Sequence, residues 1–139
     1  MSQNWGSSIA PKSNAPTPLR VLVVDDNIDA ADSMAMLLRK FGGHTVDVAY
    51  GGLQAVQIAE LSPPDVVLLD IGLPSISGFE VAERLRQLPD ADQLVIIAVT
   101  GYCHPDDRKQ SQNSGINLHL AKPVDIAQLL EYLNGSRVS

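Results

Sequence analysis

Acidic side chains follow two apolar runs of this sequence, at the point where each run ends. Val66–Leu69 is followed by Asp70, and Leu19–Val24, interrupted only by an arginine, is followed by Asp25 and Asp26. Each run is short and rich in branched apolar residues, as expected of a parallel strand buried on both faces. We therefore expect the carboxylates to stand at the ends of strands, with Asp70 presented to solvent rather than buried.

Two further apolar runs end in polar side chains. Leu94–Val99 is followed by Thr100, and Leu118–Ala121 is followed by Lys122. Right-handed crossovers place the carboxyl ends of parallel strands on one edge of a sheet. Ligands of open α/β sheets bind outside that edge. The sequence therefore predicts one pocket that holds all five polar side chains.

Three carboxylates in one pocket need a counter-charge, because two charges 4 Å apart repel by about 1 kcal/mol even in water. Hard oxygen ligands without His or Cys suit Mg²⁺, and Mn²⁺ is a possible substitute. The Lys122 ammonium and the Thr100 hydroxyl would complete a receptor for a phosphoryl group, because phosphoryl transfer depends mainly on positioning and charge neutralisation. Asp70 would be the nucleophile and would form an aspartyl phosphate.

Each feature taken alone has an ordinary structural explanation. Asp-Asp-Asn after a strand commonly forms a turn and a helix cap, a lone threonine at a strand end is usually structural, and Lys-Pro is a common loop dipeptide. These explanations do not account for polar residues after four separate apolar runs that together make one charge-balanced pocket. We therefore favour a functional site.

The segments between the runs have helical spacing. Apolar residues recur at this spacing from Ala30 to Phe41, from Leu53 to Leu61, from Val81 to Leu88 and from Ile126 to Leu133, and Thr45–Ala49 is a further short strand. Residues His104 to Ser114 have helix punctuation but no large apolar side chain, so we expect the most mobile helix there. Strands that alternate with helices predict an α/β domain of (βα)₅ type, with a parallel sheet and helices on both faces.

The amino-acid composition of the chain argues against several classes of function. The chain has 139 residues, 45% of them hydrophobic, which is enough for one packed domain. A net charge of -6 argues against direct nucleic-acid binding. A single cysteine, Cys103, excludes an internal disulfide, and no apolar stretch is long enough for membrane insertion. The N-terminus lacks a signal-peptide apolar region, so we expect a cytoplasmic protein.

We expect a flexible tail or linker at 1–18, a domain at 19–133 and a C-terminal tail at 134–139.

The stretch from about Leu19 to Leu133 resembles the receiver domains of two-component response regulators. The matching residues are the acid pair Asp25-Asp26, the Asp70 loop with Pro74 and Gly78, Thr100, and Lys122-Pro123, and their separations along the chain also fit. The stretches around Thr100 and Lys122 are similar to receivers of hybrid sensor kinases. The resemblance implies a flavodoxin-like three-layer sandwich whose five-stranded parallel sheet has the strand order 2-1-3-4-5.

The resemblance also implies a function in a phosphorelay. Asp70 would accept a phosphoryl group from a phosphohistidine on a histidine kinase or a histidine phosphotransfer protein. Asp26, Asp70 and the backbone carbonyl of Gly72 would ligate Mg²⁺, and Asp25 would act mostly through a metal-bound water. Lys122 would pair with Asp70 before phosphorylation and with the phosphoryl oxygens after it. Such a module is not an enzyme beyond its own phosphotransfer and slow autodephosphorylation.

Two positions depart from the family pattern. Gly101 follows Thr100 where alanine is frequent, and His119 occupies the aromatic switch position, which is most often Tyr or Phe. The resemblance implies that Thr100 and His119 report phosphorylation to a partner through the fourth helix, the last strand and the last helix. A half-exposed edge-strand histidine without a role is the other interpretation of His119. Family members also commonly carry a cis peptide before the proline that matches Pro123.

Three other function classes fit the sequence less well. A phosphatase of the dehalogenase type needs a second acid two residues after the nucleophile, where Gly72 stands. A docking module that is never phosphorylated does not account for the intact acid pair, Asp70 and Lys122. A flavodoxin-like cofactor binder needs a glycine-rich or hydroxyl-rich phosphate loop after the first strand, and none follows.

Overall fold

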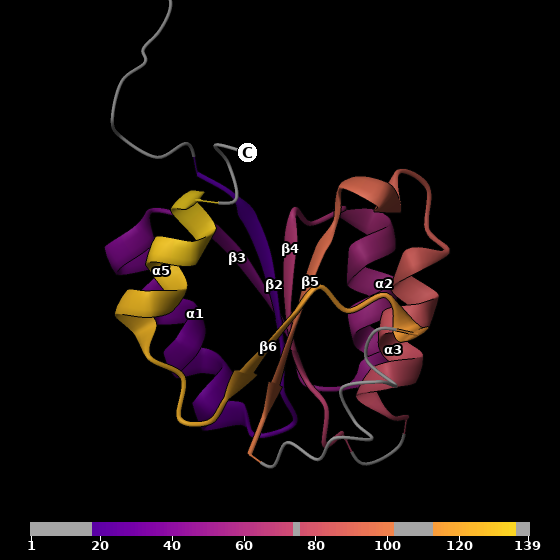
Figure 1. Ribbon diagram of the computed structural model, residues 1–139, viewed down its shortest axis with the longest axis horizontal. Helices are drawn as coiled ribbons and strands as arrows, with labels where there is room; N and C mark the ends of the chain where they lie inside the picture. The colour runs from indigo at the N-terminus through magenta and orange to yellow at the C-terminus, as the bar shows by residue number, and fades with distance from the viewer. Residues whose placement is uncertain (1–17, 74–75, 102–112, 136–139) are drawn as a thin grey trace, which may run out of the picture.

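The computed structural model describes residues 18–73, 76–101 and 113–135. Five strands among these residues form one parallel sheet, in the order β3-β2-β4-β5-β6 (Figure 1). The strands are β2 (Arg20–Val24), β3 (Thr45–Ala49), β4 (Val66–Asp70), β5 (Val95–Thr100) and β6 (Leu118–Ala121). Counted along the chain, this order is 2-1-3-4-5, so the predicted sheet is confirmed.

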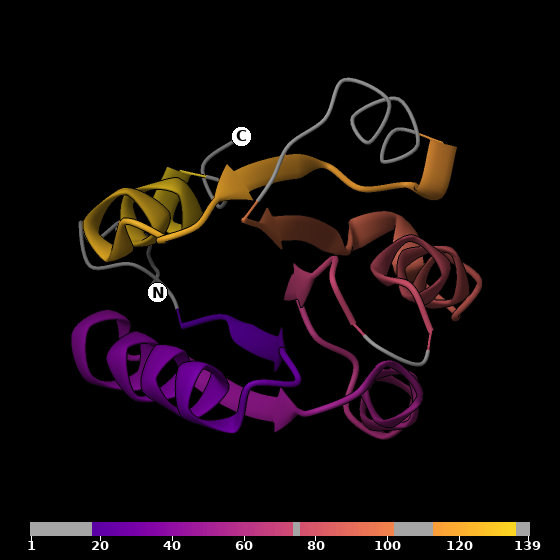
Figure 2. The same ribbon diagram turned by 90° about the horizontal axis from the view of Figure 1, so that it is seen from below.

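Helices cover both faces of the sheet and make three layers. Figures 1 and 2 show α1 (Ile28–Gly42) and α5 (Ile126–Gly135) on one face, and α2 (Gly52–Leu61) and α3 (Gly78–Arg86) on the other. A short 3₁₀ helix, η1 (Ala91–Gln93), leads into β5. The predicted mobile helix at 104–114 lies outside the described residues except for its last two positions. No helix in the described ranges has both the length and the apolar character needed to cross a membrane.

The central strand β4 shows why the Asp70 run contains no polar residue. Val66 and Leu68 pack into the hydrophobic cluster under α1 and α5, whereas Val67 and Leu69 pack into the cluster under α2 and α3. Successive side chains of a strand point to opposite faces, and here both faces are covered by helices. All four side chains are therefore buried.

Helix α1 begins two residues earlier than its apolar spacing indicates. It begins at Ile28 because the Asn27 side chain caps it, with Oδ1 accepting a hydrogen bond from the Ala30 N–H at 3.0 Å. It ends before Gly43, whose φ of 66° lies in the left-handed region that favours glycine. The predicted Gly42-Gly43 stop is therefore confirmed, and only the start differs.

Helix α3 differs from prediction at both ends. Gly78 begins the helix and is not part of the loop, because the Ser77 Oγ accepts a hydrogen bond from the Glu80 N–H at 3.2 Å. The helix ends at Arg86, before Leu88, and η1 follows. At the other end of the chain, α5 continues to Gly135, two residues beyond the expected domain boundary.

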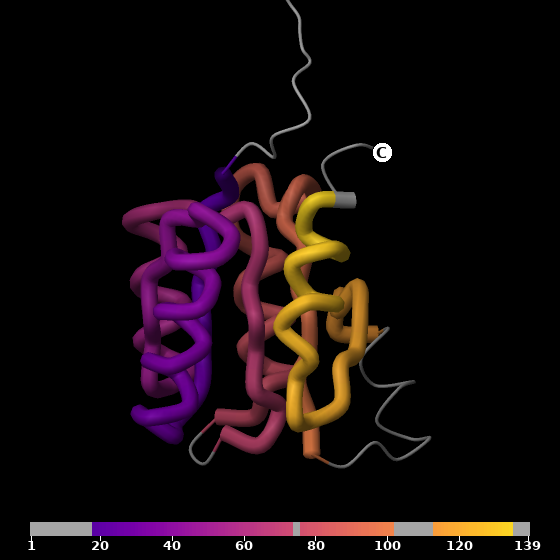
Figure 3. The backbone as a smooth tube through the Cα atoms, turned by 90° about the vertical axis from the view of Figure 1, so that its left-hand side faces the viewer, coloured from indigo at the N-terminus to yellow at the C-terminus, as the bar shows by residue number. Residues whose placement is uncertain are grey.

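The register of the sheet aligns the carboxyl ends of its strands. Asp70 of β4 lies opposite Val99 of β5, and Thr100 lies opposite Ala121 of β6. In Figure 3 the segments in which β4, β5 and β6 end lie at the lower end of the molecule. The predicted common edge for the polar residues is therefore present.

Candidate functional site

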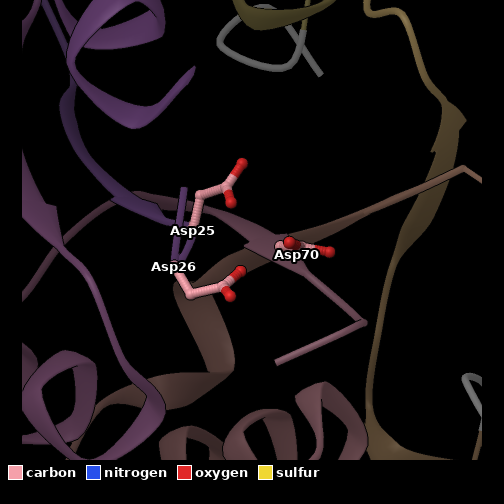
Figure 4. A group of neighbouring side chains, drawn as sticks. All are labelled: Asp25, Asp26 and Asp70. Atoms are coloured by element: carbon pink, nitrogen blue, oxygen red, sulfur yellow. The ribbon is translucent and has the colours of Figure 1, made fainter. Parts of the chain in front are cut away.

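Three carboxylates meet at this edge of the sheet. Asp25 and Asp26 follow β2, and Asp70 ends the neighbouring strand β4. Each offers an oxygen atom, and the three oxygens lie within 4.8 Å of one another (Figure 4). Asp26 is exposed and Asp25 is half-buried. The site therefore has one open side and one side that is shielded from water.

The expectation that Asp70 is presented to solvent is wrong. Only 8% of the residue is exposed, because Asp70 is still paired within the sheet and the chain after it turns back over the carboxylate. The Gly72 backbone N–H donates a hydrogen bond to the Asp70 Oδ1 at 2.9 Å. One carboxylate oxygen is thus held by the loop, and the other, Oδ2, faces Lys122.

Lys122 is the cation of the site. Its Nζ lies 3.4 Å from the Asp70 Oδ2 and 4.0 Å from the Asp25 Oδ2. The position of Lys122 follows from the sheet, because its backbone N–H donates to the Thr100 carbonyl at 2.8 Å and continues the pairing of β5 with β6. The peptide bond between Lys122 and Pro123 is cis, as the resemblance implies.

Asn27 has both a structural contact and a contact with the site, so the two explanations of the Asp-Asp-Asn sequence hold together. Its side chain caps α1, and its backbone N–H donates a hydrogen bond to the Asp25 Oδ1 at 3.0 Å. The helix cap therefore also orients an acid of the site. Sequence reasoning missed this double use, although a cap residue directly after an acid pair is a signal that could have indicated it.

Burial raises the pKa of Asp25, and the negative charge of Asp70 raises this pKa further. The hydrogen bond from the Asn27 N–H and the charge of Lys122 act in the opposite direction. The pKa is raised overall, so burial and the charge of Asp70 outweigh the hydrogen bond from Asn27 and the charge of Lys122. A cation bound at the site would favour the ionised carboxylate.

The donor set fits a hard divalent cation. The group consists of carboxylates, with no His or Cys among its described members. Oxygen donors of this kind suit Mg²⁺, which commonly takes one or two carboxylates and keeps several waters. Gly72 lies at the same edge, two residues after Asp70, and is exposed.

Thr100 and His119 lie at different positions along their strands. Thr100 ends β5 at the level of the site and is half-buried. His119 lies in the middle of β6, opposite Ala98, and is also half-buried. Leu118 and Leu120 pack toward the cluster under α1 and α5, so alternation places His119 on the other face. The helix expected beside His119 lies outside the described residues.

A pocket of about 570 Å³ opens beside the acids. Asp25, Asp70 and Lys122 line one end, and apolar side chains from α1 and from the segment that leads into α5 line much of the rest. Sequence reasoning missed this pocket. Met34 and Leu37 fit the spacing of an ordinary core face, and their partial exposure could not be read from that spacing.

Comparisons with known proteins agree with this geometry. The family model described as response regulator receiver domain matches residues 21–134. The signal transduction histidine-protein kinase BarA of Escherichia coli strain K12 is 33% identical over 125 residues, which are 87% of this chain and 14% of BarA. The response regulator MprA of Mycobacterium sp. strain KMS is 33% identical over 113 residues, which are 81% of this chain and 48% of MprA. The chain thus spans half or less of these two relatives.

A solved structure is similar over the whole domain. The receiver domain of the sensor histidine kinase PA1611 from Pseudomonas aeruginosa PAO1 was crystallised with a magnesium ion coordinated in its active site cleft. It is 30% identical to this chain with a TM-score of 0.78, and the match covers 88% of this chain and 100% of that one. The family match, the sheet order and the acidic edge lead to one conclusion: this chain belongs to the response regulator receiver domain family of two-component signal transduction.

Proposed function

We propose that Asp70 accepts a phosphoryl group from a phosphohistidine in a Mg²⁺-dependent reaction. The observation that carries this proposal is the meeting of Asp70 with two further carboxylates and the Lys122 ammonium at one edge of the sheet. Receiver domains pair with histidine kinases or histidine phosphotransfer proteins, and one of these is the proposed donor.

In the proposed reaction, an Asp70 carboxylate oxygen forms a bond to phosphorus while the phosphorus–nitrogen bond of phosphohistidine breaks. The electron pair of that bond stays on the imidazole nitrogen, so the donor leaves as neutral histidine once it holds a proton. The Lys122 Nζ is proposed to pair with the transferred phosphoryl oxygens, and its distance of 3.4 Å from the Asp70 Oδ2 supports this. The Thr100 hydroxyl, at the end of the neighbouring strand, is proposed to donate a hydrogen bond to them.

The acids at this edge of the sheet, together with Gly72, are proposed to hold the metal. Asp26, Asp70 and the Gly72 carbonyl would be direct ligands, and Asp25 would act through a water. When bound, the ion supplies neutralisation of the charge on the carboxylates and the phosphoryl oxygens. The magnesium ion in the cleft of the PA1611 receiver supports this assignment.

Phosphorylation is proposed to change partner binding through Thr100 and His119. An imidazole can donate a hydrogen bond and can change its charge near neutral pH, unlike the phenylalanine ring that is frequent in this position.

We expect the ring resonances of His119 to shift when Asp70 is phosphorylated. Partner affinity should depend on pH, and a His119→Phe variant should lose this dependence while Asp70 is still phosphorylated. The protein partner would contact β6 and α5 together with the segment 104–114, where the sequence predicts a helix.

The proposed role is that of a signalling module in the cytoplasm. Its only catalysis would be its own phosphotransfer and slow dephosphorylation. The acidic net charge of -6 does not favour direct contact with nucleic acid.

Phosphoramidate, a small phosphoryl donor, tests the proposal without a cognate kinase. Incubation with MgCl₂ should add the mass of one phosphoryl group to the intact chain. Asp70→Asn should abolish the addition, as should Asp26→Ala or an excess of EDTA. Asp90→Asn is the matched control, because Asp90 is exposed and its φ of 62° is one that asparagine tolerates. An equal mass increase in Asp70→Asn, or full modification in excess EDTA, would falsify the proposal.

A further inference from the structure

The pocket beside the acids is larger than a metal ion and a phosphoryl group require. Its volume of about 570 Å³ lies in the range of small-molecule binding sites. Such sites combine a mostly apolar wall with a few convergent polar groups. Here the polar groups lie at one end, and the following side chains form much of the apolar wall: Ala30, Met34 and Leu37 of α1, Leu68 of β4, Val124 before α5, and Ile126 at the start of α5.

The apolar wall offers surface to a ligand. Met34 and Leu37 on one side and Val124 and Ile126 on the other are each half-buried, so part of each side chain remains uncovered. Figure 2 shows α1 and α5 on the same face of the sheet, and the pocket lies between residues of the two elements. A flexible thioether such as that of Met34 adapts to ligands of different shape. An apolar chain or ring would thus gain burial in this pocket.

The charges at the polar end of the pocket determine which sign of charge a ligand must carry. Asp25 and Asp70 line the pocket, and Asp26 has an oxygen within 4.8 Å of theirs. Lys122 supplies one positive charge against these three carboxylates, and it is already in contact with two of them. Counted over the described residues, the polar end of the metal-free protein is therefore net negative. A cationic head group complements it, whereas a carboxylate or phosphate head would be repelled.

We propose that this pocket binds small organic cations in which a primary ammonium group is joined to an apolar chain or ring. The ammonium lies against Asp25 and Asp70, and the apolar part lies between α1 and the segment that leads into α5. Because ammonium and metal share the Asp70 carboxylate, and the metal also uses Asp25 through a water, each excludes the other. The ligand therefore keeps Asp70 unphosphorylated, a consequence that rests on the proposed function, whereas binding itself does not.

A series of alkylammonium ions tests binding to the unmodified full chain. Ethyl-, butyl- and hexylammonium are titrated into ¹⁵N-labelled protein in excess EDTA, with dissociation constants taken from amide shifts. Each buried methylene should raise the affinity about fourfold, which corresponds to about 0.8 kcal/mol. Hexanol and hexanoate, which lack the positive charge, should bind at least tenfold more weakly than hexylammonium. A flat series, or equal binding of hexanoate, would overturn the proposal.

Two matched substitutions locate the site. Ala30 and Ala127 are both exposed helical alanines, on α1 and α5 respectively, and of the two only Ala30 lines the pocket. Ala30→Leu should fill the pocket and weaken hexylammonium binding at least tenfold, whereas Ala127→Leu should change it less than twofold. Equal affinity in the two variants would contradict the proposed location. Circular dichroism of each variant verifies that the fold is retained.

Competition with metal separates this inference from the proposed function. Hexylammonium should raise the apparent dissociation constant of Mg²⁺ for the wild-type protein in proportion to its concentration. Simultaneous binding of both cations would refute the shared carboxylates. If hexylammonium binds as expected but phosphoramidate never modifies Asp70, the proposed function fails and the ligand site stands. If phosphoramidate modifies Asp70 but hexylammonium does not bind, the ligand site fails alone.

Discussion

At the scale of single residues, Asp25 is an acid whose charge opposes folding. Burial raises its pKa above the ordinary 3.8, and the charge of Asp70 raises it further. A carboxyl group with a raised pKa binds its proton more tightly in the folded chain than in the unfolded chain. The ionised form therefore destabilises the fold at neutral pH. This destabilisation is lost as the pH falls through the raised pKa toward 3.8.

We predict that Asp25→Asn stabilises the metal-free protein by less than about 1 kcal/mol at pH 7, because it removes a charge that burial and Asp70 disfavour and water partly screens. The amide oxygen can still accept the hydrogen bond from the Asn27 N–H, which the carboxylate accepts at 3.0 Å. Urea unfolding in excess EDTA measures the gain, which should shrink as the pH approaches the ordinary pKa of the carboxyl group. The same variant should bind Mg²⁺ more weakly. A loss of stability at pH 7 in EDTA would contradict the account.

Lys122 is predicted to affect metal binding and phosphorylation in opposite directions. Lys122→Met removes a cation that competes with metal for Asp70 and Asp25, so Mg²⁺ should bind more tightly. The phosphorylation rate with phosphoramidate should fall about 100-fold, as for the loss of one preorganised charge at a transition state. Mg²⁺ titration and intact mass measure the two effects. Lys40→Met is the control, because Lys40 is an exposed α1 residue whose Nζ lies 5.5 Å from the Phe41 ring.

The sequence predicts which polar residues meet but not how each is surrounded. The ends of the apolar runs place Asp70, Thr100 and Lys122 at one edge, because parallel strands share a direction. The burial of Asp70 depends on the following loop, whose Gly72 N–H turns back onto the carboxylate. No periodicity in the sequence carries that information.

At the scale of elements, apolar spacing predicts the helices, and capping side chains decide where they begin. The start of α3 could have been read from the sequence, because Ser77 is followed three residues later by Glu80, a capping pattern. The start of α1 is less easily read, since Asn27 follows two acids that can cap equally well. The ends of the strands, where the site lies, are the more reliable prediction because the buried runs end abruptly in polar or charged residues.

Gly78 is the point at which α3 approaches the site most closely. A Cβ added there would lie 2.7 Å from the Ile71 Cα and 3.0 Å from the Asp70 carbonyl oxygen. These are backbone atoms of the strand end and its loop, so they cannot move aside without moving Asp70. The glycine therefore allows the helix to start directly behind Asp70.

We predict that Gly78→Ala lowers the free energy of unfolding by about 1–3 kcal/mol, the range for an overpacked site. It should also slow phosphorylation, because the displaced backbone carries Asp70. Gly101→Ala is the matched control: in the described part of the chain no atom lies within 4 Å of a Cβ added at Gly101. Its stability should change by less than about 0.5 kcal/mol. Urea unfolding of both variants decides the matter, and similar losses in the two would speak against the close approach.

At the scale of the whole molecule, Arg86 joins segments that are far apart in the sequence. Its guanidinium donates to the carbonyls of Ala91 and Leu94 at 2.7 and 2.6 Å, and to the Gly115 carbonyl at 2.8 and 2.9 Å. It also donates to the Asn117 Oδ1, which in turn accepts from the Ile96 N–H at 2.7 Å. The end of α3, the start of β5 and the approach to β6 are thus held by one side chain. Because most of these partners are backbone carbonyls, no motif in the sequence predicts the network.

The network matters for the site because β6 begins directly after Asn117 and leads to Lys122. We predict that Arg86→Lys destabilises the fold by about 1–3 kcal/mol, since a lysine ammonium cannot satisfy this spread of part-buried carbonyls. Arg84→Lys on the same helix should cost less than about 0.5 kcal/mol, because the ion pair of the Arg84 side chain within the described residues is with the exposed Glu80, at 2.8 Å. Urea unfolding measures both losses, and hydrogen exchange should show faster opening of β6 in Arg86→Lys alone. Equal stability of the two variants, or unchanged exchange in β6, would show that Arg86 does not hold this strand in place.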